Sequence, residues 1–302
     1  MSEKKNMAVL QGVIPAIITP FDESGKVAFE HLENQVAYFC DAGVHGLFVS
    51  GTTGEGGYLT TEEKVRIFQK IKDTADGAVT LCAACIQPST DMVLEELRAI
   101  ERLEPDYIVA VTPYYYDASQ DDIFKHYQTI AQASSVPVLV YNIPSRTHNL
   151  IQLDTIRRLA EERNIGGVKD STGDFVPFSR GLLGDFPDSF PWIQGSDLLD
   201  GPSLLLGAKG MVTGLSNIWV DPYLTMFQAS MEGKVDVVLE CQRKVNRLFQ
   251  VIGVTGGKVN AAIKAAVSLL GRCSKWMRTS TTTLTEEEVG RVREVLQDLR
   301  LL

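Results

Sequence analysis

The sequence contains few of the residues from which metal and redox centres are built. Its 302 residues include 4 histidines and 5 cysteines, and the histidines are scattered without the short spacing of a metal-binding motif. Cys82 and Cys85 form a C-x-x-C pair inside a strand-like run, with no turn between them and no second pair. We therefore expect neither a zinc nor a redox site.

Long apolar runs and an excess of positive charge are also missing. No apolar run reaches the roughly 18 residues of a membrane span, and the polar segment Met1–Leu10 predicts no signal peptide. The net charge of −9 argues against nucleic acid or an anionic membrane surface as the main partner. Together with an odd number of scattered cysteines, these features predict a cytoplasmic protein.

Val- and Ile-rich segments alternate with amphipathic helical segments along most of the chain. We predict strands at 14–19, 45–50, 79–85, 107–112, 136–141, 165–169, 192–195 and 210–213, and helices at 29–40, 61–75 (capped by Thr61), 89–103, 120–133, 153–162 and 221–231. The strand segments do not alternate apolar with polar residues, which is typical of parallel strands buried on both faces. The pattern predicts an α/β fold, a (β/α)8 TIM barrel over residues 1–232. An open doubly wound sheet is the alternative, but its Gly-x-Gly-x-x-Gly turn after the first strand is missing.

The end of the chain shows no strand pattern. Helices are predicted at 235–251, 258–270 and 286–301, and the turn signals Gly256-Gly257 and Ser280–Thr283 separate them. We therefore expect residues 233–302 to form a three-helix appendage that packs on the barrel and carries apolar faces suited to a subunit contact.

One lysine stands directly after a short apolar run. Ile165–Val168 predicts a buried strand that leads into Lys169. An amine in an apolar pocket is less stable in its charged form, so its pKa falls, and the neutral amine forms Schiff bases with carbonyl compounds. The alternative is a strand-end lysine whose amine reaches water or pairs with Asp170.

The loops after the other predicted strands carry further reactive groups. The site of a barrel enzyme forms where its strands end and the following loops begin. Besides Lys169, those positions hold Gly51-Thr52-Thr53-Gly54-Glu55, Thr112-Pro113-Tyr114-Tyr115-Tyr116, Tyr141 to Thr147, Gly195-Ser196-Asp197 and Thr213-Gly214. Singly, each motif is more often a turn or a packing contact. Their coincidence at one face of one barrel indicates an active site.

These motifs resemble those of the dihydrodipicolinate synthase / N-acetylneuraminate lyase family of pyruvate-dependent class I aldolases. The resemblance extends from Gly12 to the C-terminal helices and implies that Lys169 forms an imine with pyruvate. It implies a proton relay through Tyr141, which Thr52 links to Tyr115, and in this family that second tyrosine usually reaches a neighbouring subunit's site. The protonated imine accepts the electrons, so the resemblance implies no metal and no organic cofactor.

The resemblance also implies the binding groups and the assembly. Thr52 and Thr53 are expected to hold the carboxylate of pyruvate, and Gly195 and Val212 to complete substrate binding. The implied partners are pyruvate, an aldehyde and further copies of the chain in a homotetramer, a dimer of dimers.

Arg146 bears on the identity of the aldehyde. Ser145-Arg146-Thr147 resembles the dihydrodipicolinate synthase branch, in which the arginine holds the carboxylate of L-aspartate 4-semialdehyde. The departures are His148 in place of a usual glycine, and Ile86-Gln87-Pro88-Ser89-Thr90 in place of Gly-x-Asn-x-Thr. The positions of a lysine effector carry Gly56, Gly57, Thr61 and Lys64, so we expect no inhibition by L-lysine.

Other functions stay open at this point. The enzymatic alternatives are an aldolase for 2-keto-3-deoxy sugar acids, an enzyme similar to N-acetylneuraminate lyase, and a hydratase-aldolase. The non-enzymatic alternative is a pseudoenzyme that binds a keto acid, although a binding protein needs no imine-forming amine.

Overall fold

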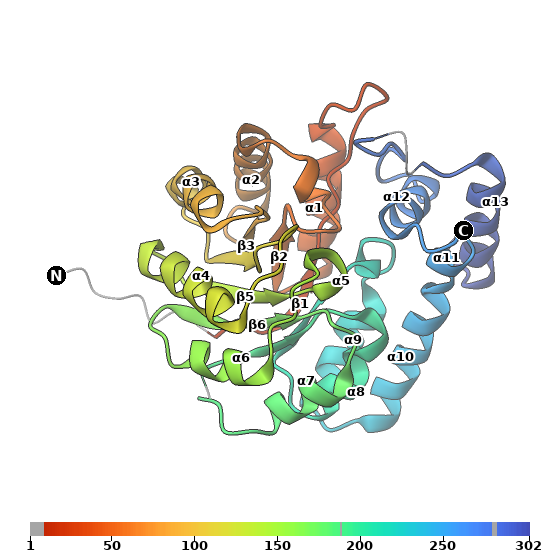
Figure 1. The fold of residues 1–302 in the computed structure, drawn as a ribbon. Helices are drawn as coiled ribbons and strands as arrows, with labels where there is room; N and C mark the ends of the chain where they lie inside the picture. The colour runs from red at the N-terminus through yellow and green to blue at the C-terminus, as the bar shows by residue number, and fades with distance from the viewer. Residues whose placement is uncertain (1–8, 188, 280–282) are drawn as a thin grey trace.

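Eight parallel strands form the centre of the molecule (Figure 1). The structure is a computed structural model that describes residues 9–187, 189–279 and 283–302. The strands are β1 (Gly12–Pro15), β2 (Gly46–Val49), β3 (Thr80–Cys85), β4 (Tyr107–Val111), β5 (Val138–Asn142), β6 (Ile165–Asp170), β7 (Trp192–Gln194) and β8 (Gly210–Thr213). Their order is β1-β8-β7-β6-β5-β4-β3-β2, and a parallel bridge between Ala16 and Phe48 joins β1 to β2. The predicted (β/α)8 barrel is confirmed.

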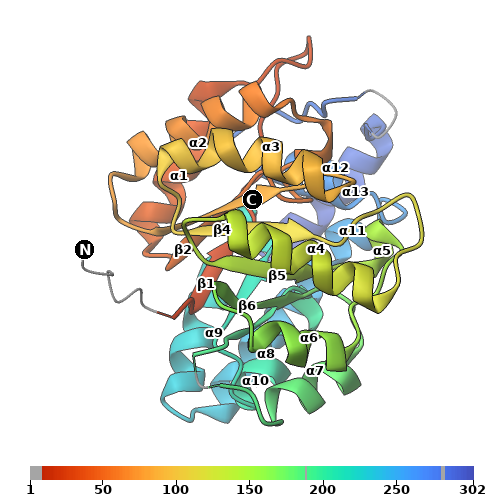
Figure 2. The same ribbon diagram turned by 60° about the vertical axis from the view of Figure 1, so that its left-hand side comes forward.

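Helices surround these strands (Figures 1 and 2). They are α1 (Phe29–Ala42), α2 (Thr61–Ala75), α3 (Thr90–Ile100), α4 (Gln120–Ala133), α5 (Pro144–Thr147), α6 (Leu153–Ala160), α7 (Phe175–Leu182), α8 (Asp200–Leu205) and α9 (Asp221–Met231). Short 3-10 turns occupy Gly56–Tyr58, Glu101–Leu103, Asp197–Leu199 and Leu215–Asn217. The sequence did not predict α5, α7 or α8. Pro177 and Gly181 interrupt the helical pattern of α7, and Gly201 and Pro202 that of α8, because both residue types are poor helix formers.

Side chains fill the inside of the barrel. This interior cluster consists of Leu10, Ile14, Ala16, Phe48, Cys82, Ala84, Tyr107, Val109, Val111, Leu139, Tyr141, Ile143, Ile193 and Val212. At the amino-terminal end of the strands, the backbone N–H of Leu10 donates to the Tyr107 hydroxyl at 3.1 Å. A second apolar layer lies between the strands and helices α1 to α7. The amino-terminal end is therefore closed, and the opposite end of the strands is left for a site.

The two cysteines of the C-x-x-C pair lie on opposite faces of β3. Cys82 belongs to the interior cluster, whereas Cys85 belongs to the layer between strands and helices. Successive side chains of a strand alternate between faces, so residues three apart point in opposite directions. Burial raises the pKa of both thiols. The two sulfurs cannot act together in a redox or zinc site.

The C-terminal helices share an apolar core with the barrel. They are α10 (Val235–Leu248), α11 (Gln250–Gly253), α12 (Val259–Leu269) and α13 (Glu286–Asp298). One cluster joins Val13 and Met211 of the barrel to Val245, Ile263 and Val292 of these helices. None of the described helices combines the length and apolar composition that crossing a membrane requires.

The expected connections of this region are partly observed. The predicted helix over 235–251 is broken after Leu248, and α11 follows it. Gly256 and Gly257 have φ angles of 65° and 84°, so a left-handed turn stands at the predicted place. Most of the turn signal Ser280–Thr283 falls on residues 280–282, which lie outside the described residues. The domain boundary at residue 233 remains a prediction.

Helix α2 begins at Thr61 as predicted, but its capping residue lies one position earlier than expected. Its N-cap is Thr60, not Thr61: the Thr60 hydroxyl accepts a hydrogen bond from the Glu63 N–H at 3.2 Å, and the Glu63 carboxylate accepts one from the Thr60 N–H at 3.0 Å. This reciprocal pair is a capping box. Of two adjacent threonines, the one followed three residues later by glutamate makes the cap.

We predict that Thr60→Ala lowers the free energy of unfolding by about 1 kcal/mol, because an orphan N–H of the first turn loses its acceptor. Thr61→Ala is the matched control, and it should change the free energy of unfolding by only a few tenths of the loss expected for Thr60→Ala. Urea denaturation of the two variants compares them directly. Equal losses would show that the cap contributes little.

Candidate active site

Lys169 lies at the carboxyl end of β6 with its side chain inside the barrel. The strand pairs Lys169 with Tyr141 of β5 and with Ile193 of β7, and the residue is 4% exposed. Its Nζ lies 4.0 Å from the ring centroid of Phe48 and 3.9 Å from that of Tyr141. The amine therefore faces two aromatic rings instead of water.

The alternative partner of Lys169 is engaged elsewhere. Asp170 follows Lys169 in the strand, so its side chain points to the other face. Its carboxylate accepts hydrogen bonds from the Asn142 amide at 3.0 Å and the Thr172 hydroxyl at 2.6 Å. Lys169 is thus neither a surface lysine nor one paired with its neighbour.

Lys169 and Tyr141 perturb each other's protonation. Burial lowers the pKa of Lys169, and the nearby charges of Tyr141 and Asp197 oppose this only in part. Burial raises the pKa of Tyr141, but attraction to Lys169 and hydrogen bonds with Thr52, Lys169 and Ser171 outweigh it, so the net pKa is below the ordinary value. Such a pair can hold a neutral amine beside an acid–base group.

Two further predicted residues surround Lys169 and Tyr141. A Cβ on Gly195 would lie 2.0 Å from the Ser171 Oγ and 3.1 Å from the Lys169 Cε, so only glycine leaves room for the lysine side chain here. Val212 is 3% exposed and belongs to the interior cluster with Tyr141. It contributes to the apolar surroundings of the amine.

Thr52 and Thr53 lie in the loop after β2. The Thr52 hydroxyl is 3.5 Å from the Tyr141 hydroxyl. A Cβ on Gly214 would lie 3.5 Å from the Thr53 Oγ, which places Thr53 beside the loop after β8. The structure therefore brings Thr52, Thr53, Tyr141 and Lys169 to one end of the barrel.

Tyr115 is not part of this group within one chain. It is 83% exposed, and its described contact is an edge-on packing against the Tyr116 ring, with centroids 4.9 Å apart. Its φ angle of 81° is left-handed, a conformation that non-glycine residues seldom adopt. The backbone thus directs this side chain away from its own site.

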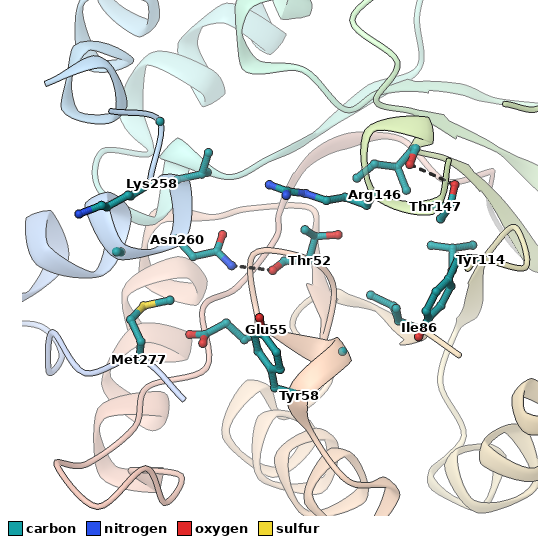
Figure 3. Close-up of a pocket in the computed structure, with 16 residues that line it drawn as sticks. Thr52, Glu55, Tyr58, Ile86, Tyr114, Arg146, Thr147, Lys258, Asn260 and Met277 are labelled. Carbon is teal, nitrogen blue, oxygen red and sulfur yellow. Dashed lines mark hydrogen bonds between the residues drawn. The ribbon is translucent and has the colours of Figure 1, made fainter. Parts of the chain in front are cut away.

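A pocket of about 480 Å³ opens above Thr52 (Figure 3). It is lined by Thr52, Glu55, Gly57, Tyr58, Ile86, Val111, Tyr114, Ile143, Arg146, Thr147, Gly257, Lys258, Val259, Asn260, Ala261 and Met277. Lys169 does not line it, but Thr52 both lines it and reaches Tyr141. Thr52 therefore connects the pocket to the buried amine.

Two cations line this pocket: Arg146 is exposed, whereas Lys258 pairs with Glu288. Arg146 lies on the short helix α5 directly after β5, and its guanidinium extends across the pocket toward the side that carries Asn260 (Figure 3). His148 caps α5 with a left-handed φ of 60° and is not among the pocket residues. A left-handed backbone conformation favours glycine. This explains why the branch that the sequence resembles usually has glycine at the position of His148.

The C-terminal helices contribute residues that sequence reasoning missed. Asn260 of α12 donates to the Thr52 carbonyl at 2.9 Å, and Lys264 of α12 pairs with Glu55 at almost no exposure. Both follow Thr52 by more than two hundred positions, and no local motif links them. The sequence offered one indication of these contacts: an asparagine and a lysine interrupt the otherwise apolar run Val259–Val267.

Asp197 is another missed residue, although it lies in a predicted strand-end motif. It is partly buried in the loop after β7, and its carboxylate accepts hydrogen bonds from the Tyr223 hydroxyl at 2.6 Å and the Leu215 N–H at 3.1 Å. Burial raises its pKa. It fastens the loop after β7 to the loop after β8.

The expected effector positions show an internal ion pair. Lys64 donates to the Glu96 carboxylate at 2.8 Å, and both side chains are 1% exposed. The Gln87 amide donates to the same carboxylate at 2.6 Å. The polar groups here satisfy one another, and the absence of inhibition by L-lysine remains a prediction. Within the described ranges, no three His, Cys, Asp or Glu side chains are arranged to hold a metal ion.

Comparison with known proteins identifies the family of this chain. The model of the dihydrodipicolinate synthetase family matches residues 9–299. The chain belongs to this family. It is accordingly an enzyme, a lyase of the pyruvate-dependent class I aldolase type, and the predicted family and enzyme class are confirmed.

Its relatives are similar over their whole length. The chain is 30% identical to 4-hydroxy-tetrahydrodipicolinate synthase of Archaeoglobus fulgidus, over 97% of this chain and 100% of the relative. It is 32% identical to the enzyme of that name from Neisseria meningitidis serogroup B, over 96% and 98%. The crystal structure of dihydrodipicolinate synthase from Aquifex aeolicus superimposes with a TM-score of 0.91 at 32% identity, over 97% and 99%.

We predict that Tyr141→Phe slows turnover by about 10²- to 10⁴-fold, the usual contribution of one acid–base group. It should also lower the pKa of Lys169 further, because Tyr141 is the largest influence that opposes the effect of burial. The amine is neutral above its pKa, so imine formation should reach half its maximal rate at a lower pH than in the wild type. Cyanoborohydride trapping of pyruvate across pH measures that midpoint. Near-full activity would show that Tyr141 is only a packing residue. A midpoint at higher pH would contradict the predicted effect of Tyr141 on the pKa of Lys169.

Proposed function

We propose that this protein is a 4-hydroxy-tetrahydrodipicolinate synthase that condenses pyruvate with L-aspartate 4-semialdehyde, a step of lysine biosynthesis. The proposal rests on one observation. The buried Lys169 amine contacts the ring of Tyr141, and Thr52 connects Tyr141 to the pocket that Arg146 lines. The names of the full-length relatives support it.

The chemistry begins at Lys169. Its neutral amine attacks the carbonyl carbon of pyruvate, the carbonyl oxygen leaves as water, and a protonated imine remains. The imine makes the methyl protons of pyruvate acidic, and Tyr141 passes one of them on toward Thr52. The resulting enamine attacks the aldehyde carbon, which forms the new C–C bond while the aldehyde oxygen takes a proton. The neutral α-amino group of the semialdehyde then attacks the imine carbon, and the bond from that carbon to the Lys169 nitrogen breaks. Lys169 leaves as a neutral amine, and the proton stays on the new cyclic imine.

The remaining site residues hold the substrates. In this proposal the hydroxyls and N–H groups of Thr52 and Thr53 bind the carboxylate of pyruvate. Gly195 gives the imine room, and Val212 keeps its surroundings apolar. Arg146 grips the carboxylate of the semialdehyde with two parallel hydrogen bonds, which the planar guanidinium is suited to make.

A second copy of the chain completes the relay in this proposal. Tyr115 and Tyr116 are 83% and 78% exposed, which is unusual for two adjacent aromatic side chains. We propose that Tyr115 reaches Thr52 of a neighbouring copy within a homotetramer. One solved relative is described as a monomeric dihydrodipicolinate synthase variant, with a TM-score of 0.91 at 26% identity, over 97% of this chain and 98% of that relative. The assembly is thus not fixed by membership of the family.

A cytoplasmic location is part of the same proposal. All five cysteines lie within the described residues as free thiols, and four of them are buried. Unpaired thiols are typical of a reducing compartment.

We predict that borohydride reduction in the presence of pyruvate adds one reduced pyruvyl group to the peptide that holds Lys169. Lys169→Ala should abolish the label, because Lys258, the lysine that lines the pocket, pairs with Glu288 at 2.8 Å. Peptide mass spectrometry identifies the labelled position. A label on another peptide, or one that survives the substitution, would contradict the proposed nucleophile.

We predict that Arg146→Ala lowers kcat/KM for aspartate semialdehyde about tenfold or more, which corresponds to the roughly 1.5–3 kcal/mol of a hydrogen bond to a charged group. Neutral aldehydes should change much less, and pyruvate trapping should persist. Arg157→Ala is the matched control, because Arg157 pairs with Asp154 on the outer helix α6. A panel of aldehydes compares the three proteins.

The opposite pattern would favour the alternative function. If the wild type prefers neutral sugar aldehydes and Arg146→Ala affects all aldehydes equally, an aldolase for 2-keto-3-deoxy acids replaces this assignment.

A further inference from the structure

Helix α12 carries two polar side chains toward the loop that holds Thr52. Between Val259 and Val267 the helix is otherwise built from alanine, valine and isoleucine, nearly all buried. Asn260 and Lys264 stand four residues apart and therefore lie on one face of the helix. A helix that is apolar on nearly all sides is a core helix, so polar residues on its buried side require partners.

Asn260 binds the backbone of Thr52. Its amide Nδ2 donates to the Thr52 carbonyl at 2.9 Å, and the same carbonyl accepts the Glu55 N–H at 3.1 Å. Figure 3 shows this contact at the wall of the pocket. The carbonyl of Thr52 is thereby held by its own turn and by a helix more than two hundred residues away in sequence.

Lys264 binds the other end of the same loop. Its ammonium donates to the Glu55 carboxylate and, at 3.0 Å, to the Trp276 carbonyl. The side chains of Lys264 and Glu55 are 0% and 1% exposed. The second carboxylate oxygen of Glu55 accepts the Arg278 N–H at 3.1 Å. A charge pair so deeply buried is costly to break from one side, so it fixes Glu55 firmly.

These two contacts bracket the part of the loop that faces Tyr141. The Thr52 and Tyr141 hydroxyls are 3.5 Å apart, at the outer limit for a hydrogen bond between oxygens. A displacement of the loop by a few tenths of an ångström decides whether this bond forms. Glu55 also has a left-handed φ of 57°, which the surrounding contacts must maintain.

We propose that Asn260 and Lys264 are positioning residues that set the Thr52 hydroxyl for proton transfer with Tyr141. They act on Tyr141 through the loop from Thr52 to Glu55. The proposal rests on the proposed function, because it takes the Lys169 imine and the Tyr141 relay from it. It does not depend on which aldehyde is used.

The test measures proton transfer without any aldehyde. In D₂O, the imine–enamine equilibrium exchanges the methyl protons of pyruvate for deuterium, and NMR gives the rate. Asn260→Ala should slow this exchange about five- to tenfold, the effect of one neutral hydrogen bond, while borohydride trapping on Lys169 reaches the wild-type extent. Asn260→Asp, which keeps the side-chain shape but removes the donor, should slow it as well and serves if the alanine variant does not fold.

A double-mutant cycle separates positioning from general destabilisation. Asn260→Ala should have no further effect on exchange in a Thr52→Val background, because its route through the Thr52 hydroxyl is already lost. The charge-free pair Lys264→Met with Glu55→Gln should slow exchange in the wild-type background. The matched control is Lys64→Met with Glu96→Gln, which removes another buried lysine–glutamate pair away from the loop and should leave the exchange rate unchanged.

The outcomes are distinct. Wild-type exchange in the folded Asn260 variants, an Asn260→Ala effect that persists beside Thr52→Val, or equal slowing by the control pair would each overturn the positioning role alone. A wild-type protein that neither traps pyruvate nor exchanges its protons would overturn the proposed function, and this inference with it.

Discussion

The burial of one lysine amine is the constraint on which the site depends. A charged amine in an apolar interior costs several kcal/mol unless it is compensated. Lys169 has two aromatic faces and a phenol hydroxyl beside it, and the charge of Asp197 nearby. Those faces, at 4.0 Å and 3.9 Å, attract a cation, but they do not replace hydration fully, so the pKa falls. Burial thus favours the neutral form of the Lys169 amine.

The barrel achieves this burial with ordinary strand geometry. Alternation along β6 points Lys169 inward and Asp170 outward, and the register with β5 places Tyr141 directly beside the lysine. Leu10 and Tyr107 pack at the amino-terminal end, and Lys169 lies at the opposite end, beside the loops. Gly195 leaves the space that the lysine side chain occupies. The Lys169 side chain is thus placed by a barrel strand and not by a loop, which favours a precise position.

The loops around the amine are fixed by polar contacts that the barrel strands do not supply. Asp197 joins the loops after β7 and β8, and α12 fastens the loop after β2 through Asn260 and Lys264. Burying the Lys264–Glu55 pair brings little net stability, but it specifies one position for its loop. The C-terminal helices therefore form one wall of the pocket and share the core of the barrel, instead of only covering its surface.

The sequence by itself determined the architecture, because buried parallel strands read as apolar runs. The position of Lys169 at a strand end singled it out from the residues alone, whereas the roles of Tyr141, Thr52 and Arg146 came from the resemblance and remain predictions. Helices α7 and α8 were missed because Pro and Gly hide the helical period, and burial of their apolar faces overrides propensity. Tertiary structure alone decided that Asn260 and Lys264 meet Thr52 and Glu55. Contacts between residues two hundred positions apart leave no period or motif in the sequence, since only chain folding brings them together.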